Sequence, residues 1–143
     1  LLETEGNTFW KVARELNLEE NMKATGKNIS LQGELIGEGI QGNPYKIKGQ
    51  TVRFFTGFDI DKYQRISFPE LVVMLSDMGL QYVPILNQEL GFVLPETVED
   101  MLKYAEAKSV LNDKTEREGV VVRSMDGTIS FKAISNKFLL NEK

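Results

Sequence analysis

The sequence of 143 residues contains no cysteine and no histidine. Without cysteine the protein has no disulfide and no thiol nucleophile, and this absence favours an intracellular, cytoplasmic location. Without histidine it lacks both the commonest general base and the commonest ligand for transition metals. Catalysis by this chain would therefore depend on carboxylates, lysines and arginines, or on a hard cation that prefers oxygen ligands.

Long apolar runs are absent as well. No stretch approaches the roughly 20 apolar residues of a membrane-spanning helix, so we expect no membrane partner. The composition, with 41% hydrophobic and 27% charged residues, is typical of a soluble globular protein. The sequence has no internal repeat and no evident linker, and its length is sufficient for one domain with a sizeable core.

The net charge is −4, and the charges are unevenly distributed along the chain. Residues 67–118 contain ten acids and four bases, whereas residues 41–66 contain five bases and two acids. Residues 119–143 contain four bases and two acids. The basic excess falls on predicted strands, and this asymmetry is compatible with a partner that carries phosphate groups.

Hydrophobic periodicity and turn residues predict an α+β fold, with a largely antiparallel sheet and packed helices. We predict helices at residues 8–24 (capped by Thr8), 67–79 and 95–109, and strands at residues 29–36, 45–48, 51–60 and 81–86. The second and third helices each begin with a capping box, formed by Ser67 with Glu70 and by Thr97 with Asp100.

A β-hairpin is predicted at residues 118–135, because Asp126-Gly127 is a strong signal for a two-residue type I′ turn. Such a turn sets Val121 opposite Lys132 and Arg123 opposite Ser130, all on one face. The other face is apolar and is expected to enter a core; it consists of Val120, Val122, Ile129, Phe131 and Ala133. The hairpin thus predicts a cationic surface backed by an apolar one.

Four segments resemble, in their order, the later motifs of the covalent nucleotidyltransferase superfamily, which includes ATP-dependent RNA and DNA ligases and capping enzymes. These segments are "GELIGEGIQGN" (33–43), "FFTGFDI" (54–60), "EGVVVR" (118–123) and "SFKAISNKF" (130–138). Together with the helix at residues 8–24, they are most similar to the RNA ligase family typified by a Deinococcus enzyme. The resemblance covers nearly the whole chain and implies part of a ligase nucleotidyltransferase domain.

The resemblance implies nucleoside-binding roles for three residues. Glu34 is expected to bind the ribose hydroxyls, for which a carboxylate is a suitable acceptor. Phe58 is expected to stack on the adenine, and Val121 to pack on the other face of the base. Without the other motifs, Glu34 would be interpreted as a half-buried strand residue paired with a lysine. Phe58 would be interpreted as a core residue, as Phe54 and Phe55 are expected to be.

The resemblance also implies roles in binding phosphate and metal. Lys132 is expected to contact the nucleotide phosphate, and Glu118 to help bind the catalytic Mg²⁺ or Mn²⁺, directly or through water. Arg123 stands where many relatives have lysine, and its guanidinium is also suited to phosphate oxygens. Ser130 stands where many relatives have another lysine. Without the motif pattern, Glu118 is an ordinary residue at the start of a strand.

The nucleophilic lysine of this superfamily lies in a Lys-x-Asp-Gly motif, which does not occur in the 143 residues. The one Asp-Gly pair is in the hairpin turn, and the residue two positions before it is Ser124. We therefore expect residues 1–143 to be the C-terminal portion of an adenylation domain whose nucleophile lies upstream. The chain by itself is expected to be inactive, since a phosphoramide cannot form without that lysine.

The parent protein is expected to be an ATP-dependent RNA ligase. It would join 5′-phosphate and 3′-hydroxyl RNA ends through enzyme-adenylate and RNA-adenylate intermediates, with ATP and Mg²⁺ or Mn²⁺ as cofactors. One alternative is a non-catalytic module that binds a nucleotide or an RNA end. Another is a DNA ligase or capping-type nucleotidyltransferase. A Lys-x-Asp-Gly motif upstream would favour an enzyme over a binding module.

Overall fold

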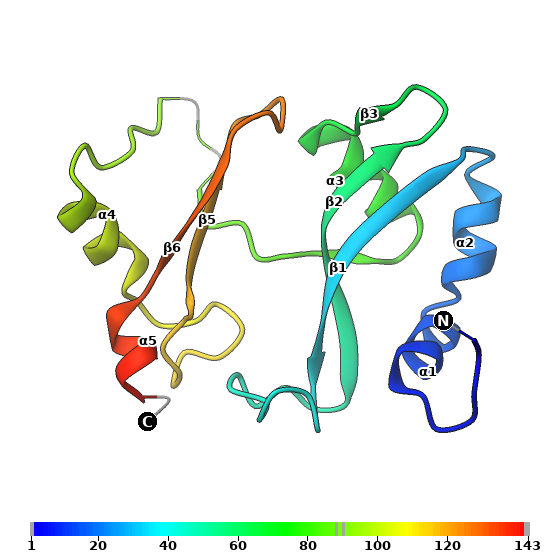
Figure 1. Cartoon of the computed structure of the whole chain (residues 1–143), viewed down its shortest axis with the longest axis horizontal. Coiled ribbons are helices and arrows are strands. Elements are labelled where there is room, and N and C mark those ends of the chain that lie inside the picture. Colours follow the sequence, from blue (N-terminus) through cyan, green and yellow to red (C-terminus); the bar gives the residue numbers. More distant parts are fainter. Residues whose placement is uncertain (1, 88, 90, 142–143) are drawn as a thin grey trace. The chain divides into compact units, whose positions relative to one another are not determined.

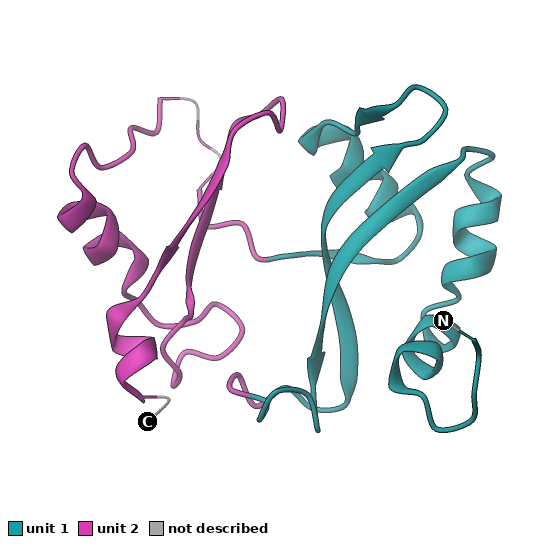
Figure 2. Cartoon of the chain, viewed as in Figure 1, with its two compact units in different colours: residues 1–43, 47–83 teal, residues 44–46, 84–143 magenta. Residues whose placement is uncertain are grey.

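The computed structural model describes residues 2–87, 89 and 91–141, and the chain divides into two compact units (Figures 1 and 2). Unit 1 consists of residues 1–43 and 47–83, and unit 2 of residues 44–46 and 84–143. The chain therefore passes from one unit to the other at three places. Each of them is a short stretch of irregular backbone and none has a linker composition.

Unit 1 contains a small mixed sheet with three helices. The helices are α1 (Thr8–Glu15), α2 (Leu18–Ala24) and α3 (Phe68–Asp77), and the strands are β1 (Ile29–Gly37), β2 (Gln50–Asp59), β3 (Gln64–Arg65) and β4 (Gln81–Tyr82). The long strands β1 and β2 pair antiparallel, as do β2 and β3, while β4 pairs parallel with β2. The predicted α+β fold with a largely antiparallel sheet is confirmed.

The core of unit 1 forms between β2 and the region of α3. Its buried residues are Phe54, Leu71, Leu75, Met78 and Leu80. Helix α3 begins after Ser67 with a proline in its first turn, and Gly79 follows it at a φ of 68°. Leu75, with 1% of its surface exposed, is the most buried of these side chains.

The predicted helix at residues 8–24 is two helices. Asn17 takes a left-handed conformation with a φ of 49°, and this residue separates α1 from α2. The cap of α1 is Asn7 instead of Thr8, because the Asn7 side-chain oxygen accepts hydrogen bonds from the backbone N–H groups of Phe9 and Trp10. Asparagine is among the few residues that adopt the left-handed region readily, which explains why the break occurs at Asn17.

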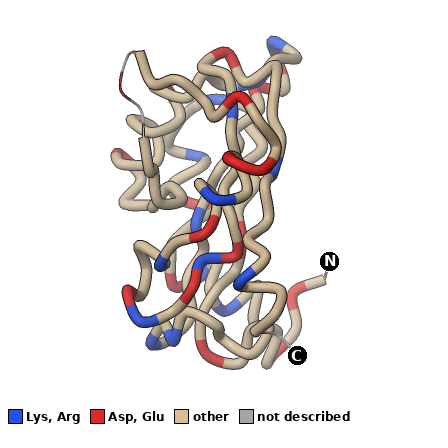
Figure 3. The backbone as a smooth tube through the Cα atoms, turned by 90° about the vertical axis from the view of Figure 1, so that its left-hand side faces the viewer, with Lys and Arg blue, Asp and Glu red and all other residues tan. Residues whose placement is uncertain are grey.

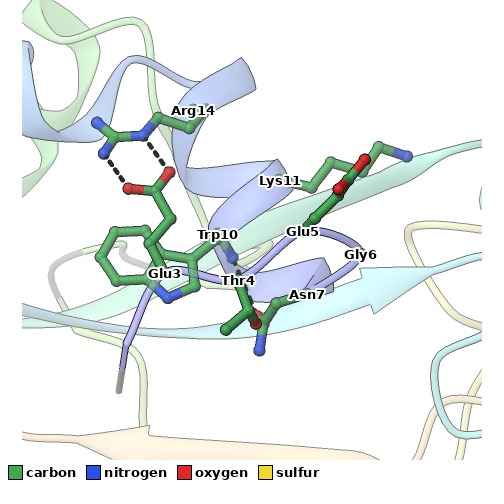
Figure 4. A pocket seen from close by; sticks show the side chains of 8 residues that line it. All are labelled: Glu3, Thr4, Glu5, Gly6, Asn7, Trp10, Lys11 and Arg14. Atoms are coloured by element: carbon green, nitrogen blue, oxygen red, sulfur yellow. Dashed lines mark hydrogen bonds and ion pairs between the residues drawn. The ribbon is translucent and has the colours of Figure 1, made fainter.

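The N-terminal segment is fastened to α1 (Figure 4). Arg14 donates two hydrogen bonds to the Glu3 carboxylate, at 2.9 and 2.6 Å, and its guanidinium lies over the Trp10 ring. The hydrogen bond from Arg14 lowers the pKa of Glu3. The shallow hollow beside them, of about 250 Å³, contains none of the predicted site residues. We interpret this region as structural.

Unit 2 is built on a two-stranded hairpin and two helices. Its elements are α4 (Val98–Ala105), β5 (Gly119–Arg123), β6 (Ser130–Ile134) and α5 (Asn136–Asn141). Helix α4 packs against β6, and the buried core consists of Met101, Ala105, Val120 and Ala133. Thr97 is confirmed as the N-cap of α4, since its hydroxyl accepts a hydrogen bond from the Asp100 backbone N–H at 3.1 Å. The capping box predicted for Ser67 and Glu70 is wrong, because the Ser67 side chain makes no capping hydrogen bond to α3.

Several predicted boundaries were wrong. Residues 45–48 are not a strand, because Lys46 has a φ of 52°, which a strand cannot accommodate. The strand predicted at 81–86 is confined to Gln81–Tyr82, and helix α5 was not predicted. Among the described residues, every helix is too short or too polar to cross a lipid bilayer.

Candidate functional site

The β5–β6 hairpin has the predicted register. Val121 pairs with Lys132, and Arg123 with Ser130. The turn type differs from the prediction, because of the two central residues only Gly127 has a positive φ, at 72°. The Gly127 N–H donates to the Ser124 carbonyl at 2.9 Å, as in a type I turn that ends in a left-handed glycine.

The Asp126 carboxylate organises this turn. Its Oδ1 atom accepts hydrogen bonds from the Ser124 hydroxyl at 2.5 Å, from the Thr128 N–H at 3.0 Å and from the Thr128 hydroxyl at 2.8 Å. The Ser124 hydrogen bond, together with those from Thr128, lowers the pKa of Asp126 to about 2. These bonds stabilise the charged form of the carboxylate.

We predict that the turn loosens in acid. Because the folded-state pKa of Asp126 lies below the ordinary value of about 3.9, its contribution to stability is present above that pH and is lost as the pH falls toward 2. The measurement is an NMR titration of the Asp126 carboxyl carbon and the Gly127 amide. An Asp126→Asn variant should not show this titration, and a midpoint near 4 in the native protein would contradict the prediction.

The two faces of the hairpin differ as predicted near its base, and depart from the prediction near its tip. Val120 and Ala133 are buried against α4, whereas Val121 is 54% exposed on the opposite face. Phe131 and Ile129, expected in the core, are 44% and 67% exposed. In Figure 1 the hairpin extends beyond the end of α4, so this helix does not cover its distal part.

Glu118 and Lys132 form an ion pair on the exposed face of the hairpin. Glu118 lies immediately before β5, and its Oε1 atom contacts the Lys132 Nζ. Both side chains remain more than two fifths exposed, so the pair contributes little to stability. Sequence reasoning assigned both residues to the site separately and did not predict their contact, which spans 14 positions.

The backbone of Glu118 is held on both sides. Its N–H donates to the Tyr45 hydroxyl at 3.1 Å, and its carbonyl accepts a hydrogen bond from the Ser135 N–H at 2.7 Å. The next residue, Gly119, lies so close to β6 that a Cβ atom there would be 2.1 Å from the Ala133 carbonyl oxygen. Arg123, at the other end of β5, is partly buried.

Glu34 and Phe58 share one face of the β1–β2 pair in unit 1. Residues paired across antiparallel strands point to the same side, and Ser30 pairs with Phe58. Glu34 lies four residues along β1 from Ser30, so it projects from that same side. Glu34 is exposed and Phe58 is partly buried.

A β-bulge decides which phenylalanine enters the core. The register skips Phe55, since Gln32 pairs with Thr56 while Gly33 pairs with Phe54. Phe54 consequently points away from the Phe58 side and is only 4% exposed. Phe55, expected to be a core residue like Phe54, is partly buried.

The bulge also sets Arg53 opposite Glu34, which the sequence reasoning missed. The Arg53 Nε atom is buried and has no hydrogen-bond partner in the described part of the chain. On the same side, the Phe58 ring meets Tyr63 edge to face, with centroids 5.5 Å apart. This side of the strand pair therefore presents a carboxylate, a guanidinium and an aromatic ring.

The residues present are compatible with a hard divalent cation. Within the described ranges there is no group of three or more Asp, Glu, His or Cys side chains that could enclose a metal. Glu118 would thus be a single carboxylate at a metal site, not one of a cluster. Mg²⁺ is commonly held in this way, by one or two carboxylates together with water and substrate phosphates. The described side chains therefore fit a Mg²⁺ or Mn²⁺ ion that keeps water and phosphate oxygens as ligands. They do not fit a metal ion held by three or more protein side chains.

Acidic and basic residues are interspersed along the backbone (Figure 3). Many of them are paired locally, as Lys103 is with Glu99 and Asp100 on α4, and Lys108 with Glu116. These local pairs offset part of the negative charge at residues 67–118. The segmental charge excess in the sequence is therefore a weaker guide to a partner than the individual side chains on the two strand faces.

A family model and several solved structures that match this chain are of RNA ligases. Residues 2–137 match the family model described as RNA ligase. Solved structures of Naegleria gruberi RNA ligase are similar over 99% of this chain, which spans 42% of theirs. A lysine-to-methionine mutant with AMP and Mn is 39% identical with a TM-score of 0.90, and a lysine-to-alanine mutant with ATP and Mn is 39% identical with a TM-score of 0.88. No curated protein sequence matches significantly.

Proposed function

Because the chain belongs to the RNA ligase family, we propose that it is part of an ATP-dependent RNA ligase that joins 5′-phosphate and 3′-hydroxyl RNA ends. The reaction would pass through enzyme-adenylate and RNA-adenylate intermediates and would serve RNA repair or a related sealing process. The observation that carries the proposal is the exposed Glu118–Lys132 ion pair. It lies on the hairpin that contains two of the ligase-like motifs and has the predicted strand register. Since ATP is the proposed substrate, we place the protein in the cytoplasm.

We further propose that the chain is the C-terminal part of the adenylation domain, in the Deinococcus-type branch of the family. Two facts support this placement. The 143 residues contain no Lys-x-Asp-Gly motif, and the chain spans about two fifths of the length of the similar Naegleria ligase structures. The nucleophilic lysine would then belong to a part of the protein that precedes these residues.

In unit 1, the shared face of β1 and β2 would bind the nucleoside. Glu34 is exposed and can accept hydrogen bonds from both ribose hydroxyls. The Phe58 ring is partly exposed and meets Tyr63 in a T-shaped contact, and a partly exposed aromatic ring is suited to stack on adenine.

In unit 2, the exposed face of the hairpin would bind phosphate and metal. Lys132, with Arg123 near the far end of β5, supplies cationic groups for phosphate oxygens, and Val121 supplies an apolar surface for the base. Glu118 would hold Mg²⁺ or Mn²⁺, which supplies charge neutralisation for phosphoryl transfer when bound. Lys132 and Glu118 form an ion pair, so each side chain offsets the charge of the other.

The proposal predicts covalent labelling of the complete protein. Incubation with Mn²⁺ and ATP that carries a radioactive α-phosphate should label the protein, and adding 5′-phosphorylated RNA should release the label as sealed RNA. The 143-residue chain alone should take up no label. Binding of RNA ends without any labelling would instead indicate a non-catalytic module, and preferential sealing of nicked DNA would indicate a DNA ligase.

A further inference from the structure

The connection between β1 and β2 contains a pinched loop at residues 44–46. The Asn43 side-chain amide donates to the Ile47 carbonyl at 2.9 Å, and its oxygen accepts from the Ile47 N–H at 3.0 Å. Asn43 and Lys46 both have positive φ angles, of 47° and 52°. Positive φ at residues other than glycine is costly and is retained where the surrounding contacts require it.

Tyr45, in the middle of this loop, belongs to unit 2. Asn43 and Ile47 belong to unit 1, whereas Pro44–Lys46 are part of unit 2. The Asn112 side chain donates to the Tyr45 carbonyl at 3.0 Å, and the Tyr45 hydroxyl accepts the Glu118 N–H at 3.1 Å. The Tyr45 side chain is partly buried.

The Tyr45 hydroxyl contacts Glu118, the acidic member of the ion pair on the hairpin face. The Glu118 carbonyl is already fixed by the Ser135 N–H, and the Glu118 side chain by Lys132. The Tyr45 hydroxyl completes the set by fixing the amide on the other side of the same Cα atom. Because a side chain leaves the backbone along the Cα–Cβ bond, fixing both flanking peptide groups fixes where the carboxylate begins.

We propose that Tyr45 is a positioning residue for Glu118 and orients its carboxylate for divalent-metal binding. This inference rests on the proposed metal-binding role of Glu118. In this role the Tyr45 hydroxyl acts through the Glu118 backbone, by keeping it in one conformation. The glycine-rich segment around residues 33–45 then serves two purposes, since it carries Glu34 on β1 and Tyr45 in the loop that follows.

The test uses Tyr45→Phe in the complete protein, because this change keeps the ring and removes only the hydroxyl. Mn²⁺ binding in the presence of ATP is measured by electron paramagnetic resonance, and exchange of the Glu118 amide by hydrogen–deuterium exchange. Loss of one hydrogen bond to a partly buried N–H should weaken Mn²⁺ binding about fivefold and speed exchange of the Glu118 amide about tenfold. Tyr82→Phe in unit 1 is the matched control and should leave both values unchanged.

Mn²⁺ affinity and amide exchange equal to those of the native protein would overturn the proposal. If Tyr45→Phe fails to fold, Asn112→Ala decides, since it releases the Tyr45 carbonyl and leaves the hydroxyl present. Weaker Mn²⁺ binding in that variant supports the proposal, and unchanged binding overturns it. Glu118→Ala separates the two ideas: if it binds Mn²⁺ as tightly as the native protein, the metal-binding role of Glu118 fails.

Discussion

Lys132→Ala should reduce ATP-dependent labelling of the complete protein roughly a hundredfold, because one preorganised cationic contact is worth about 3 kcal/mol in the transition state. The side chain is on the exposed face of the hairpin, so its removal opens no core cavity. It also leaves Glu118 in partial contact with water, which limits the cost of losing the ion pair. The melting temperature should therefore change little, and labelling is followed alongside thermal unfolding.

Lys137→Ala is the control for this experiment. Lys137 is also an exposed lysine in unit 2, paired with Glu106 at 3.2 Å, and has no proposed role in the site. It should label like the native protein. Lys132→Arg should restore labelling only in part, since the guanidinium is larger and planar. Native-like labelling by Lys132→Ala would refute the phosphate-binding role, and a collapsed melting temperature would indicate a structural role instead.

Gly119→Ala should destabilise unit 2 by about 3 kcal/mol, at the upper end of the cost of overpacking. A Cβ atom there would lie 2.1 Å from the Ala133 carbonyl oxygen and 2.9 Å from the Ile134 Cα atom, both of them backbone atoms. The strands can relieve this contact only by separating where Glu118 joins β5. Labelling should fall as well, because Glu118 and Lys132 would no longer be held together.

The measurement for Gly119→Ala is urea unfolding combined with hydrogen exchange of the β5 and β6 amides. Ser130→Ala, an exposed position on β6, is the comparison and should change stability by less than about 0.5 kcal/mol. Faster exchange is expected in β5 and β6 for Gly119→Ala alone. An unfolding midpoint equal to that of Ser130→Ala would show that the strands accommodate the methyl group.

The hairpin was the most predictable part of the fold, for a local reason. Alternation along residues 119–123 and the Asp126-Gly127 pair act over short distances, and together they determine which residues oppose each other. The exact turn type was less predictable, because the side-chain hydrogen bonds of Asp126 favour a different backbone path. Phe131 is 44% exposed, and which residues of the apolar face are covered depends on the elements packed against the hairpin, which the hairpin pattern does not contain.

The contacts that complete the candidate site were beyond sequence reasoning because they join distant residues. Glu118 and Lys132 meet across 14 positions, and Tyr45 reaches Glu118 across 73. Residues 45–48 have a strand-like pattern, yet the Asn43 side chain competes for the backbone groups of Ile47 and forms a loop. The bulge at Phe55 likewise leaves no local signal, although it decides that Phe54 is buried.

The pinched loop also bears on the order in which the chain is made. Residues 44–46 leave the ribosome long before Asn112 and Glu118, their partners 67 and 73 positions later. Leu80 is the last of the buried core residues of unit 1 to be synthesised, so that unit can form first. At that point Asn112 and Glu118, the partners of Tyr45, have not yet been synthesised. Closing so long a segment costs little more than closing a moderate one, but the entropy of closure is lost before the contact can offset it. Completion of the Glu118 site would then be among the last events of folding.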